Sequence, residues 1–405
     1  MYFPMLKPRR ISTGTTTLNI DDMQSTVKFI RELYDEPDEF IPLHAPVLDG
    51  NEGLYLKDCI DTTFVSSVGK YVDQFEKMTA QFTGAKYAVA VVNGTAALQI
   101  ALQLAGVDRD DEVITQAVSF VATANAITHA GAEPIFIDVD KETMGMSPES
   151  LESWLVNNVR RESKKGSVQV VNTNTQRRVS AIVPMHTFGH PCRIDEIKKI
   201  ADDYSIPVVE DSAESLGSYF KGQHTGTFGL AGIISYNGNK TITTGGGGMI
   251  ITNDIEFARQ AKHITTTAKV PHPWEYFHDE VGYNFRLTNV NAAIGVAQME
   301  QLGEFLVNKR QTAGRYADFF ADQKSTFIHE PKNAKSNFWL NAIALENREI
   351  RDQFLEYSNK KGVMTRPVWR LTNKLDMFRH CQHDELVSSQ WLEDRVVNIP
   401  SGVRV

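Results

Sequence analysis

The sequence has few cysteines, and those it has are far apart. Only Cys59, Cys192 and Cys381 occur in 405 residues. An odd number at such wide spacing gives no disulfide framework, so we expect a protein of the reducing cytoplasm. No apolar run approaches the ~18 residues of a membrane span, and no apolar core follows the basic residues at the N-terminus. We therefore expect a globular protein that is neither exported nor embedded in a membrane.

Excess positive charge is also missing. Lys and Arg number 42 against 50 Asp and Glu, which gives a formal net charge of −8. Affinity for a phosphate backbone needs a basic surface, so nucleic acid is not an expected partner. The glycine run 245–248 lacks both the Walker pattern and the dinucleotide fingerprint. The histidine pairs at 186/190 and 380/383 have no third and fourth ligand nearby in the sequence, so no metal site is predicted.

What the sequence does contain, from about residue 70 onward, is an alternation of strand and helix patterns. Short apolar runs bounded by turn residues alternate with segments of helical periodicity. Such alternation predicts an α/β fold with a mostly parallel, helix-covered sheet. The predicted strands of this sheet are 87–92, 112–115, 134–138, 181–184, 206–210, 232–236 and 248–251. We therefore expect a seven-stranded sheet.

The alternation weakens beyond about residue 275, which suggests a second, smaller unit. We expect a leader and helix over 1–39, a large domain over 40–275 and a small C-terminal α/β domain over 276–405. Pro271 and Pro273 mark the hinge region. The polar stretch 163–178 is predicted to be an insertion loop, and residues 1–20 a flexible leader or a strand extension.

Lys240 and Asp211 carry the strongest chemical signal. Asp211 ends one buried strand, and Lys240 follows the next strand by a few residues, so both should reach the carboxyl edge of the sheet, where α/β proteins bind ligands. A lone lysine after a strand is most often a solvated loop charge. Beside an acid, however, it can form a Schiff base with a cofactor aldehyde, while the acid keeps a pyridine nitrogen protonated. The pair predicts pyridoxal 5′-phosphate (PLP) chemistry.

Three other segments favour the same cofactor. Asn93-Gly94-Thr95-Ala96 joins a strand to a helix, where free N–H groups and the positive helix end favour a phosphate. Ser235, five residues before Lys240, is placed to add a hydroxyl. Phe120 opens a helix at the same edge, and its ring can stack on a pyridine ring. Taken singly, each of these features is more often purely structural.

Together these segments resemble the DegT/DnrJ/EryC1/StrS sugar aminotransferases, from about Phe40 to the C-terminus. The matching motifs are 64–69, 93–98, 120–125, 210–214, 235–240 and 282–288. The resemblance implies a fold type I PLP-dependent aminotransferase that acts on nucleotide-linked keto sugars for cell-surface glycans. The run of sequence near 64–69 and 112–138 is most similar to the branch that uses UDP-4-keto-6-deoxy-N-acetylglucosamine.

The resemblance also implies roles for single residues. Lys240 would bond to the aldehyde of PLP and move protons, and Asp211 would pair with the pyridine nitrogen. L-glutamate would be the amino donor that converts PLP to its pyridoxamine form. The other implied cofactor residues are Gly94, Thr95, Ala96, Phe120, Glu214, Ser235, Asn237 and Asn284. Implied substrate residues are Ser66, Ser67, His186 and Arg286. Glu214 departs from the glutamine of many members, and a carboxylate near the phenolic oxygen needs a proton. Asn284 would serve the neighbouring subunit, which implies an obligate homodimer with shared sites.

Two other functions remain open at this point. One is a different PLP enzyme of the same fold, such as a lyase or a desulfurase, although no cysteine lies in an evident active-site loop. The other is a noncatalytic PLP-binding regulator, against which the intact Lys240 and Asp211 argue. The retained lysine also argues against the family's dehydratase branch, in which a histidine replaces it.

Overall fold

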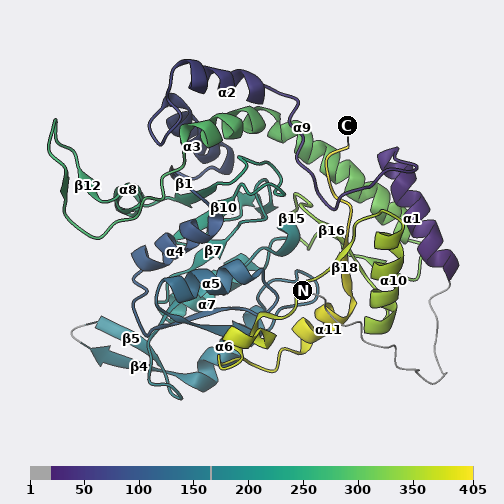
Figure 1. The fold of residues 1–405 in the computed structure, drawn as a ribbon. Helices are drawn as coiled ribbons and strands as arrows, with labels where there is room; N and C mark the ends of the chain where they lie inside the picture. The colour runs from purple at the N-terminus through teal and green to yellow at the C-terminus, as the bar shows by residue number, and fades with distance from the viewer. Residues whose placement is uncertain (1–19, 165–166, 405) are drawn as a thin grey trace, which may run out of the picture.

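The computed structural model describes residues 20–164 and 167–404. In these residues a seven-stranded central sheet forms with the order β1-β11-β10-β7-β6-β2-β3 (Figure 1). Its strands are β1 (Tyr87–Val91), β2 (Glu112–Gln116), β3 (Glu133–Ile137), β6 (Val179–Val183), β7 (Val209–Asp211), β10 (Ala231–Ser235) and β11 (Gly248–Thr252). Only β11 runs antiparallel to its neighbours in this sheet. The predicted mostly parallel seven-stranded sheet is confirmed.

Helices cover both faces of this sheet, because its strands are apolar on both sides. In β10, Ile233 packs into the core on one face and Ile234 into the core on the other. The first face is covered by α4 (Gly94–Leu104), α5 (Val121–His129) and α8 (Ile255–Thr265). The second is covered by α3 (Lys70–Thr83), α9 (Asn289–Phe320), α6 (Pro148–Asn158) and α7 (Ile194–Asp203).

Helix α6 begins with a capped first turn. The Ser147 hydroxyl accepts the Ser150 N–H at 3.2 Å, and Pro148 occupies the first helical turn, where its missing N–H costs no hydrogen bond. This cap fixes the chain direction after β3 and so keeps α6 against the sheet.

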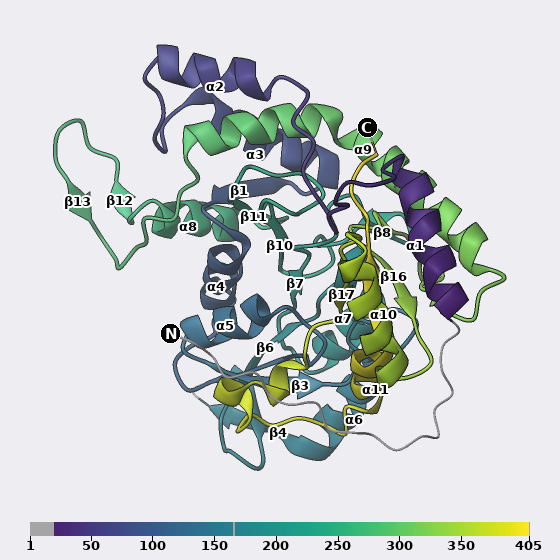
Figure 2. The same ribbon diagram turned by 45° about the vertical axis from the view of Figure 1, so that its right-hand side comes forward.

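A second, antiparallel sheet has the order β14-β16-β18-β17. Its strands are β14 (Thr326–Phe327), β16 (Asn341–Ala344), β17 (Arg366–Pro367) and β18 (Val396–Ile399). Helices α1 (Ile20–Tyr34) and α10 (Arg348–Lys360) and the end of α9 share its core, while α11 (Val387–Arg395) leads into β18 (Figure 2). The N-terminal helix therefore packs with C-terminal elements. The domain boundaries at residues 39 and 275 stay predictions.

The segment predicted as an insertion loop is folded differently. The hairpin of β4 (Val159–Lys164) and β5 (Ser167–Asn172) begins before this segment, and all of β5 lies within it. Val170 and Val171 are buried, so this polar stretch contributes apolar side chains to the core. The polar residues between the valines hid the strand pattern. The predicted leader lies outside the described residues, except for Ile20.

The predicted hinge region forms part of a projecting hairpin. Strands β12 (Lys269–Val270) and β13 (Phe277–His278) flank it, and both ribbon views show the hairpin extending away from the central sheet. Helix α2 (Glu52–Asp61) packs on α9. Short pieces complete the fold: β8 (Tyr219–Phe220), β9 (Gln223–His224), β15 (Ala334–Lys335) and three 3-10 turns. Across the described residues, no helix combines the length and apolar character that a membrane crossing requires.

Candidate active site

The predicted acid and lysine meet at one edge of the central sheet. Strands β7 and β10 are parallel neighbours, so their carboxyl ends lie side by side. Asp211 is the last residue of β7, and Lys240 lies in the loop that follows β10. They line a cavity of about 340 Å³. The other predicted residues that line it are Gly94, Thr95, Phe120, Glu214, Ser235 and Asn237.

Lys240 is held between a carboxyl group and an aromatic ring. Its Nζ lies 3.2 Å from Oε1 of Glu214 and 3.9 Å from the centroid of the Trp339 ring. The other carboxyl oxygen of Glu214 accepts the Phe188 N–H at 2.9 Å. These contacts point the amine into the cavity and leave little of its side chain exposed.

The proton balance of Glu214 follows from its burial. Complete burial raises the pKa of this carboxyl to about 7, although the nearby Lys240 ammonium and the Phe188 N–H oppose the shift. Near neutral pH the group therefore holds its proton for part of the time. Burial in the site therefore explains how Glu214 can carry the proton that the sequence analysis expected of a carboxyl here.

Glu214→Gln should change how stability depends on pH. Between pH 5 and 7 the folded protein binds a proton at Glu214 that the unfolded chain has lost, so stability falls as pH rises through this window. Glutamine cannot titrate. The difference in free energy of unfolding between the variant and the wild type should therefore rise, in favour of the variant, by on the order of 2 kcal/mol from pH 5 to pH 8. Denaturant unfolding of both cofactor-free proteins measures this. Parallel pH profiles would contradict it.

Asp211 is fixed by hydrogen bonds from two neighbours. Its Oδ2 accepts the Thr123 hydroxyl at 2.6 Å, and its Oδ1 accepts the Ala213 N–H at 3.2 Å. Ser119 in turn donates to the Thr123 hydroxyl at 2.8 Å. These hydrogen bonds fix the orientation of the Asp211 carboxyl group in the cavity. The sequence analysis missed Thr123, which lies one helical turn after Phe120 and for that reason faces the same cavity.

The start of α4 offers free donors to an anion. The Asn93 side chain caps the helix by accepting the Ala96 N–H at 2.8 Å. Within the described helix, Gly94 and Thr95 are too close to the helix start for intrahelical N–H partners, and both line the cavity. A Cβ at Gly94 would lie 3.1 Å from Cβ of Ser235, so glycine keeps this cradle open. Ala96 itself does not line the cavity, because the Asn93 cap occupies its N–H.

Aromatic rings form the outer wall. Phe120 is about half exposed, and its ring centroid lies 6.2 Å from that of Trp369. Trp339 and Trp369 come from the C-terminal part of the chain and line the same cavity, so both parts of the fold build the site. The sequence analysis did not find these two tryptophans, since no local motif marks them.

Besides Ala96, five predicted residues lie outside this cavity. Asn284 and Ser66 are exposed, Ser67 and Arg286 are partly buried, and Arg286 pairs with the edge strand β1 through Val91. The Nε atom of Arg286 is buried without a hydrogen-bond partner in the described structure. The structure therefore does not bring these four residues to the cavity of their own chain.

His186 is also away from the cavity, and it is completely buried. Its Nε2 lies 3.0 Å from Oε2 of Glu210, and its Nδ1 lies 3.3 Å from the backbone nitrogen of Cys192. The Glu210 carboxylate also accepts N–H groups from Gly226, Phe228 and Gly229. His186 thus takes part in a network below the strand ends. A direct contact with substrate does not follow from this placement.

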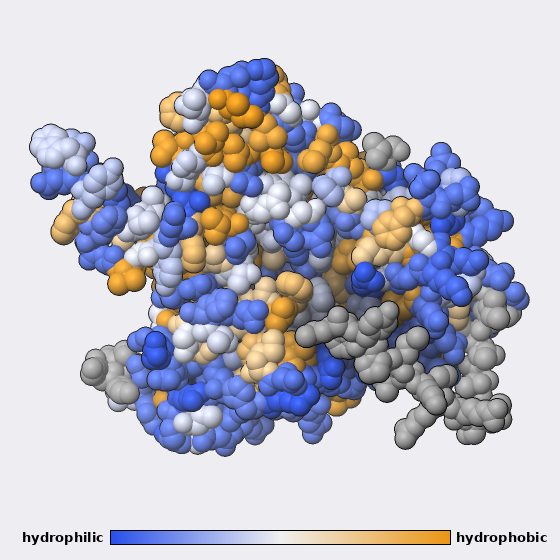
Figure 3. Space-filling model, viewed as in Figure 1, coloured by the Kyte–Doolittle hydropathy of each residue, from blue (hydrophilic) through white to orange (hydrophobic). Residues whose placement is uncertain are grey.

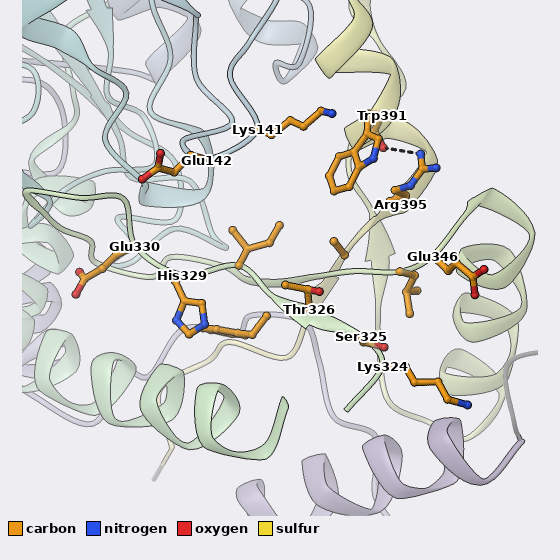
Figure 4. A pocket seen from close by; sticks show the side chains of 14 residues that line it. Lys141, Glu142, Lys324, Ser325, Thr326, His329, Glu330, Glu346, Trp391 and Arg395 are labelled. Carbon is orange, nitrogen blue, oxygen red and sulfur yellow. Dashed lines mark hydrogen bonds between the residues drawn. The ribbon is translucent and has the colours of Figure 1, made fainter. Parts of the chain in front are cut away.

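A second, larger hollow of about 740 Å³ lies between β14 and α11 (Figure 4). On its wall, Lys141 and Arg395 flank the Trp391 ring at 5.0 and 5.1 Å from the centroid. None of the predicted site residues lines this hollow. The chemistry is therefore assigned to the smaller cavity, where the lysine and the acid converge.

The residues of the smaller cavity match PLP group by group. The buried Asp211 carboxylate would pair with a pyridine nitrogen, and the Lys240 amine would bond to the aldehyde. The Phe120 ring would stack on the pyridine ring, and the start of α4 would offer donors to the phosphate. When bound, the cofactor withdraws electrons from the substrate carbon that carries the amine. Fold and site together define a PLP-dependent enzyme.

Comparison with known proteins identifies the family. The family model described as DegT/DnrJ/EryC1/StrS aminotransferase matches residues 46–405. GDP-perosamine synthase of Escherichia coli O157:H7 is 35% identical over 368 residues, covering 90% of this chain and 93% of that protein. The putative pyridoxal phosphate-dependent aminotransferase EpsN of Bacillus subtilis is 35% identical over 89% of this chain and 91% of its own. The chain belongs to the DegT/DnrJ/EryC1/StrS aminotransferase family, and its cofactor is PLP.

Solved structures support the fold. The aminotransferase TlmJ of Streptoalloteichus hindustanus superposes with a TM-score of 0.80 at 24% identity, over 89% of this chain and 93% of that one. Helicobacter pylori PseC, an aminotransferase involved in the biosynthesis of pseudoaminic acid, gives 0.79 at 22% identity, over 89% and 94%. The predicted fold type I architecture is thereby confirmed.

Proposed function

We propose that the protein transfers an amino group from L-glutamate to the 4-keto carbon of a nucleotide-linked deoxy sugar. The observation that carries this proposal is the placement of Lys240 and Asp211 at one cavity in a chain of this aminotransferase family. Related proteins named as sugar-nucleotide synthases cover about nine-tenths of the chain. A lyase or a noncatalytic regulator has no comparable support.

The side chains of the site divide the work. Nζ of Lys240 takes the proton from the carbon of the donor that carries the amine, and it moves a proton again when the amine passes to the sugar. Glu214, 3.2 Å from that nitrogen, keeps the amine oriented and exchanges a proton with it. Trp339 and Trp369 cover the cavity, exclude water and so strengthen the charge interactions inside it.

The sugar nucleotide is the finer part of the proposal. Three of the relatives are GDP-perosamine synthases at 33 to 35% identity, which supports a GDP-linked sugar. The UDP-linked 4-keto-6-deoxy-N-acetylglucosamine predicted from the sequence is the second candidate. Incubation with 15N-labelled glutamate and each keto-sugar nucleotide, followed by mass spectrometry of the sugar, separates them. Amine transfer to neither sugar would overturn the proposal.

We further propose that the enzyme works as a homodimer. Exposed apolar side chains gather around α2 and the turn before α3, where Figure 3 shows hydrophobic residues on the surface. They are Leu54, Ile60, Phe64, Val65 and Val68. The projecting hairpin exposes Trp274, Tyr276, Phe277 and Val281. A lone two-stranded hairpin is marginally stable in water, so a second copy of the chain is the expected support for it.

The dimer would also explain the residues outside the cavity. Asn284 and Arg286 follow the projecting hairpin and do not reach the cavity of their own chain. In a dimer they would serve the partner's cofactor phosphate and the diphosphate of the substrate, for which a guanidinium is well shaped.

Subunit exchange tests the shared site. A Lys240→Ala protein is mixed with one that carries Asn284→Ala and Arg286→Ala, each inactive alone. In a hybrid with shared sites, one site collects all the defects and the other collects none. Random exchange should therefore restore about a quarter of wild-type activity. Lack of recovery despite proven exchange would mean that each subunit builds its site alone.

A further inference from the structure

Three metal-ligating side chains meet on the far side of the central sheet from the hairpin β12–β13. Glu133 is the first residue of β3, and His380 and Cys381 follow the 3-10 turn Asp376–Phe378. One ligand atom from each lies within 4.8 Å of the others. His380 Nε2 is 3.7 Å from Oε2 of Glu133 and 3.9 Å from Sγ of Cys381. Almost 250 residues of sequence separate Glu133 from the other two, so sequence spacing did not reveal the cluster.

The separation of 3.7 Å between His380 and Glu133 lies within the ligand spacing of a tetrahedral ion, and the 3.9 Å between His380 and Cys381 lies just beyond it. Zinc binds sulfur at about 2.3 Å and nitrogen or oxygen at about 2.0–2.2 Å, so its tetrahedral ligands lie roughly 3.3–3.8 Å from one another. The set of one thiol, one imidazole and one carboxyl is typical of zinc. A thiolate and a carboxylate would also balance the two charges of the ion. An adjacent cavity of about 280 Å³, lined by all three residues, has room for a water as fourth ligand.

The surroundings are those of a supported site. The guanidinium of Arg177 donates to Oε2 of Glu133 at 2.8 Å, which orients the carboxylate. The Cys381 side chain is buried, so packing holds its sulfur beside the other two ligand atoms.

The cluster lies at the outer edge of β3, where a C-terminal segment pairs with this strand. The segment after Cys381 runs along the outer edge of β3: Phe136 donates its N–H to the Gln382 carbonyl at 2.9 Å, and Asp384 donates to the Phe136 carbonyl at 3.2 Å. Since β3 is the last strand of the sheet, only this segment covers its edge among the described strands. An ion at the cluster would fasten the segment to the first residue of β3.

We propose that Glu133, His380 and Cys381 bind one zinc ion that ties the C-terminal segment to the edge of the central sheet. Binding breaks the S–H bond of Cys381, forms the Zn–S bond and releases the proton to solvent, with no change of oxidation state. The ion has a structural role, because the cluster does not line the cavity of Lys240.

Zinc retention tests the proposal. Holoenzyme dialysed against a chelator is mixed with zinc chloride, freed of loose metal by gel filtration and analysed by atomic emission. The wild type should retain one zinc per chain. Cys381→Ser and His380→Ala should each retain about a tenth or less. His383→Ala removes an exposed neighbour outside the cluster. His263→Ala disrupts another group of potential metal ligands among the described residues, His263 with Asp279 and Glu280. Both controls should retain zinc like the wild type.

Cobalt gives a readout of coordination that does not depend on activity. The Co²⁺ form of the wild type should show the intense visible bands of a tetrahedral ion, at longer wavelength than the cofactor, and Cys381→Ser should lose them. Circular dichroism checks that each variant is folded. A wild type that retains no zinc, or a His380→Ala, Cys381→Ser double variant that retains zinc unchanged, overturns the proposal.

Discussion

Lys240→Ala is expected to abolish amine transfer, with a fall in rate of at least about a thousandfold. Lys240 is the one lysine among the described residues that line the cavity, so no other amine is placed to bond to the cofactor and to return the proton. Transfer of label from 15N-glutamate to the sugar nucleotide measures the loss. Near-normal transfer by this variant would remove the basis for the assigned site.

Lys240→Arg is the matched control for charge. Arginine keeps a cation beside Glu214 and the Trp339 ring, so the ion pair and the cation–π contact are retained. Its guanidinium does not lose its proton in proteins and cannot act as a base. The arginine variant should therefore be as inactive as the alanine variant. Activity that survived in the arginine variant alone would mean that only the charge matters.

Asp211→Asn should retain cofactor and yet lose about a hundredfold or more in rate. A neutral amide does not stabilise a positive charge on the pyridine nitrogen, so electron withdrawal by the cofactor weakens. Cofactor content is measured by absorbance and the rate by single-turnover reaction with glutamate. The Thr123→Val variant keeps the carboxylate but removes its 2.6 Å hydrogen bond, and should lose roughly tenfold. An unchanged rate for Asp211→Asn would show that this carboxylate does not hold the ring charge.

The central sheet was predictable because its strands are buried on both faces and therefore form continuous apolar runs. The order of the strands, with β11 inserted antiparallel between β1 and β10, depends on long-range pairing that no local pattern encodes. The hairpin β4–β5 was missed for a different reason. Its valines alternate with polar residues in a stretch dominated by Ser, Lys and Asn, which favours a loop on composition alone.

In the site, the residues found from sequence are those attached to strand ends. Asp211, Ser235 and Lys240 follow from the rule that parallel strands present their carboxyl ends at one edge. The family resemblance implied a substrate contact for His186, but its side chain turns toward the buried Glu210 carboxylate. The asparagine before the helix start could have indicated that its side chain caps the helix and occupies the Ala96 N–H.

Other parts of the site come from distant segments. Trp339 and Trp369 reach the cavity from loops of the C-terminal part, where strands are short and the apolar pattern is weak. Their positions depend on how the second sheet packs against the first, which is a property of the whole chain. The roles assigned to Asn284 and Arg286 depend on a second chain and stay predictions.

Helix α9 connects the two sheets to the wall of the cavity through Trp339. Its 32 residues form one unbroken rod, about 48 Å long, that packs on α3 at one end and on the second sheet at the other. About two-thirds of the way along α9, the buried Lys309 donates to the carbonyl groups of Trp339 and Ser401 at 3.2 and 2.6 Å. Because the Trp339 ring contacts Lys240, the contact with α9 also fixes the position of this ring beside the reactive amine. The space above Lys240 therefore depends on where α9 lies, although no residue of α9 lines the cavity itself.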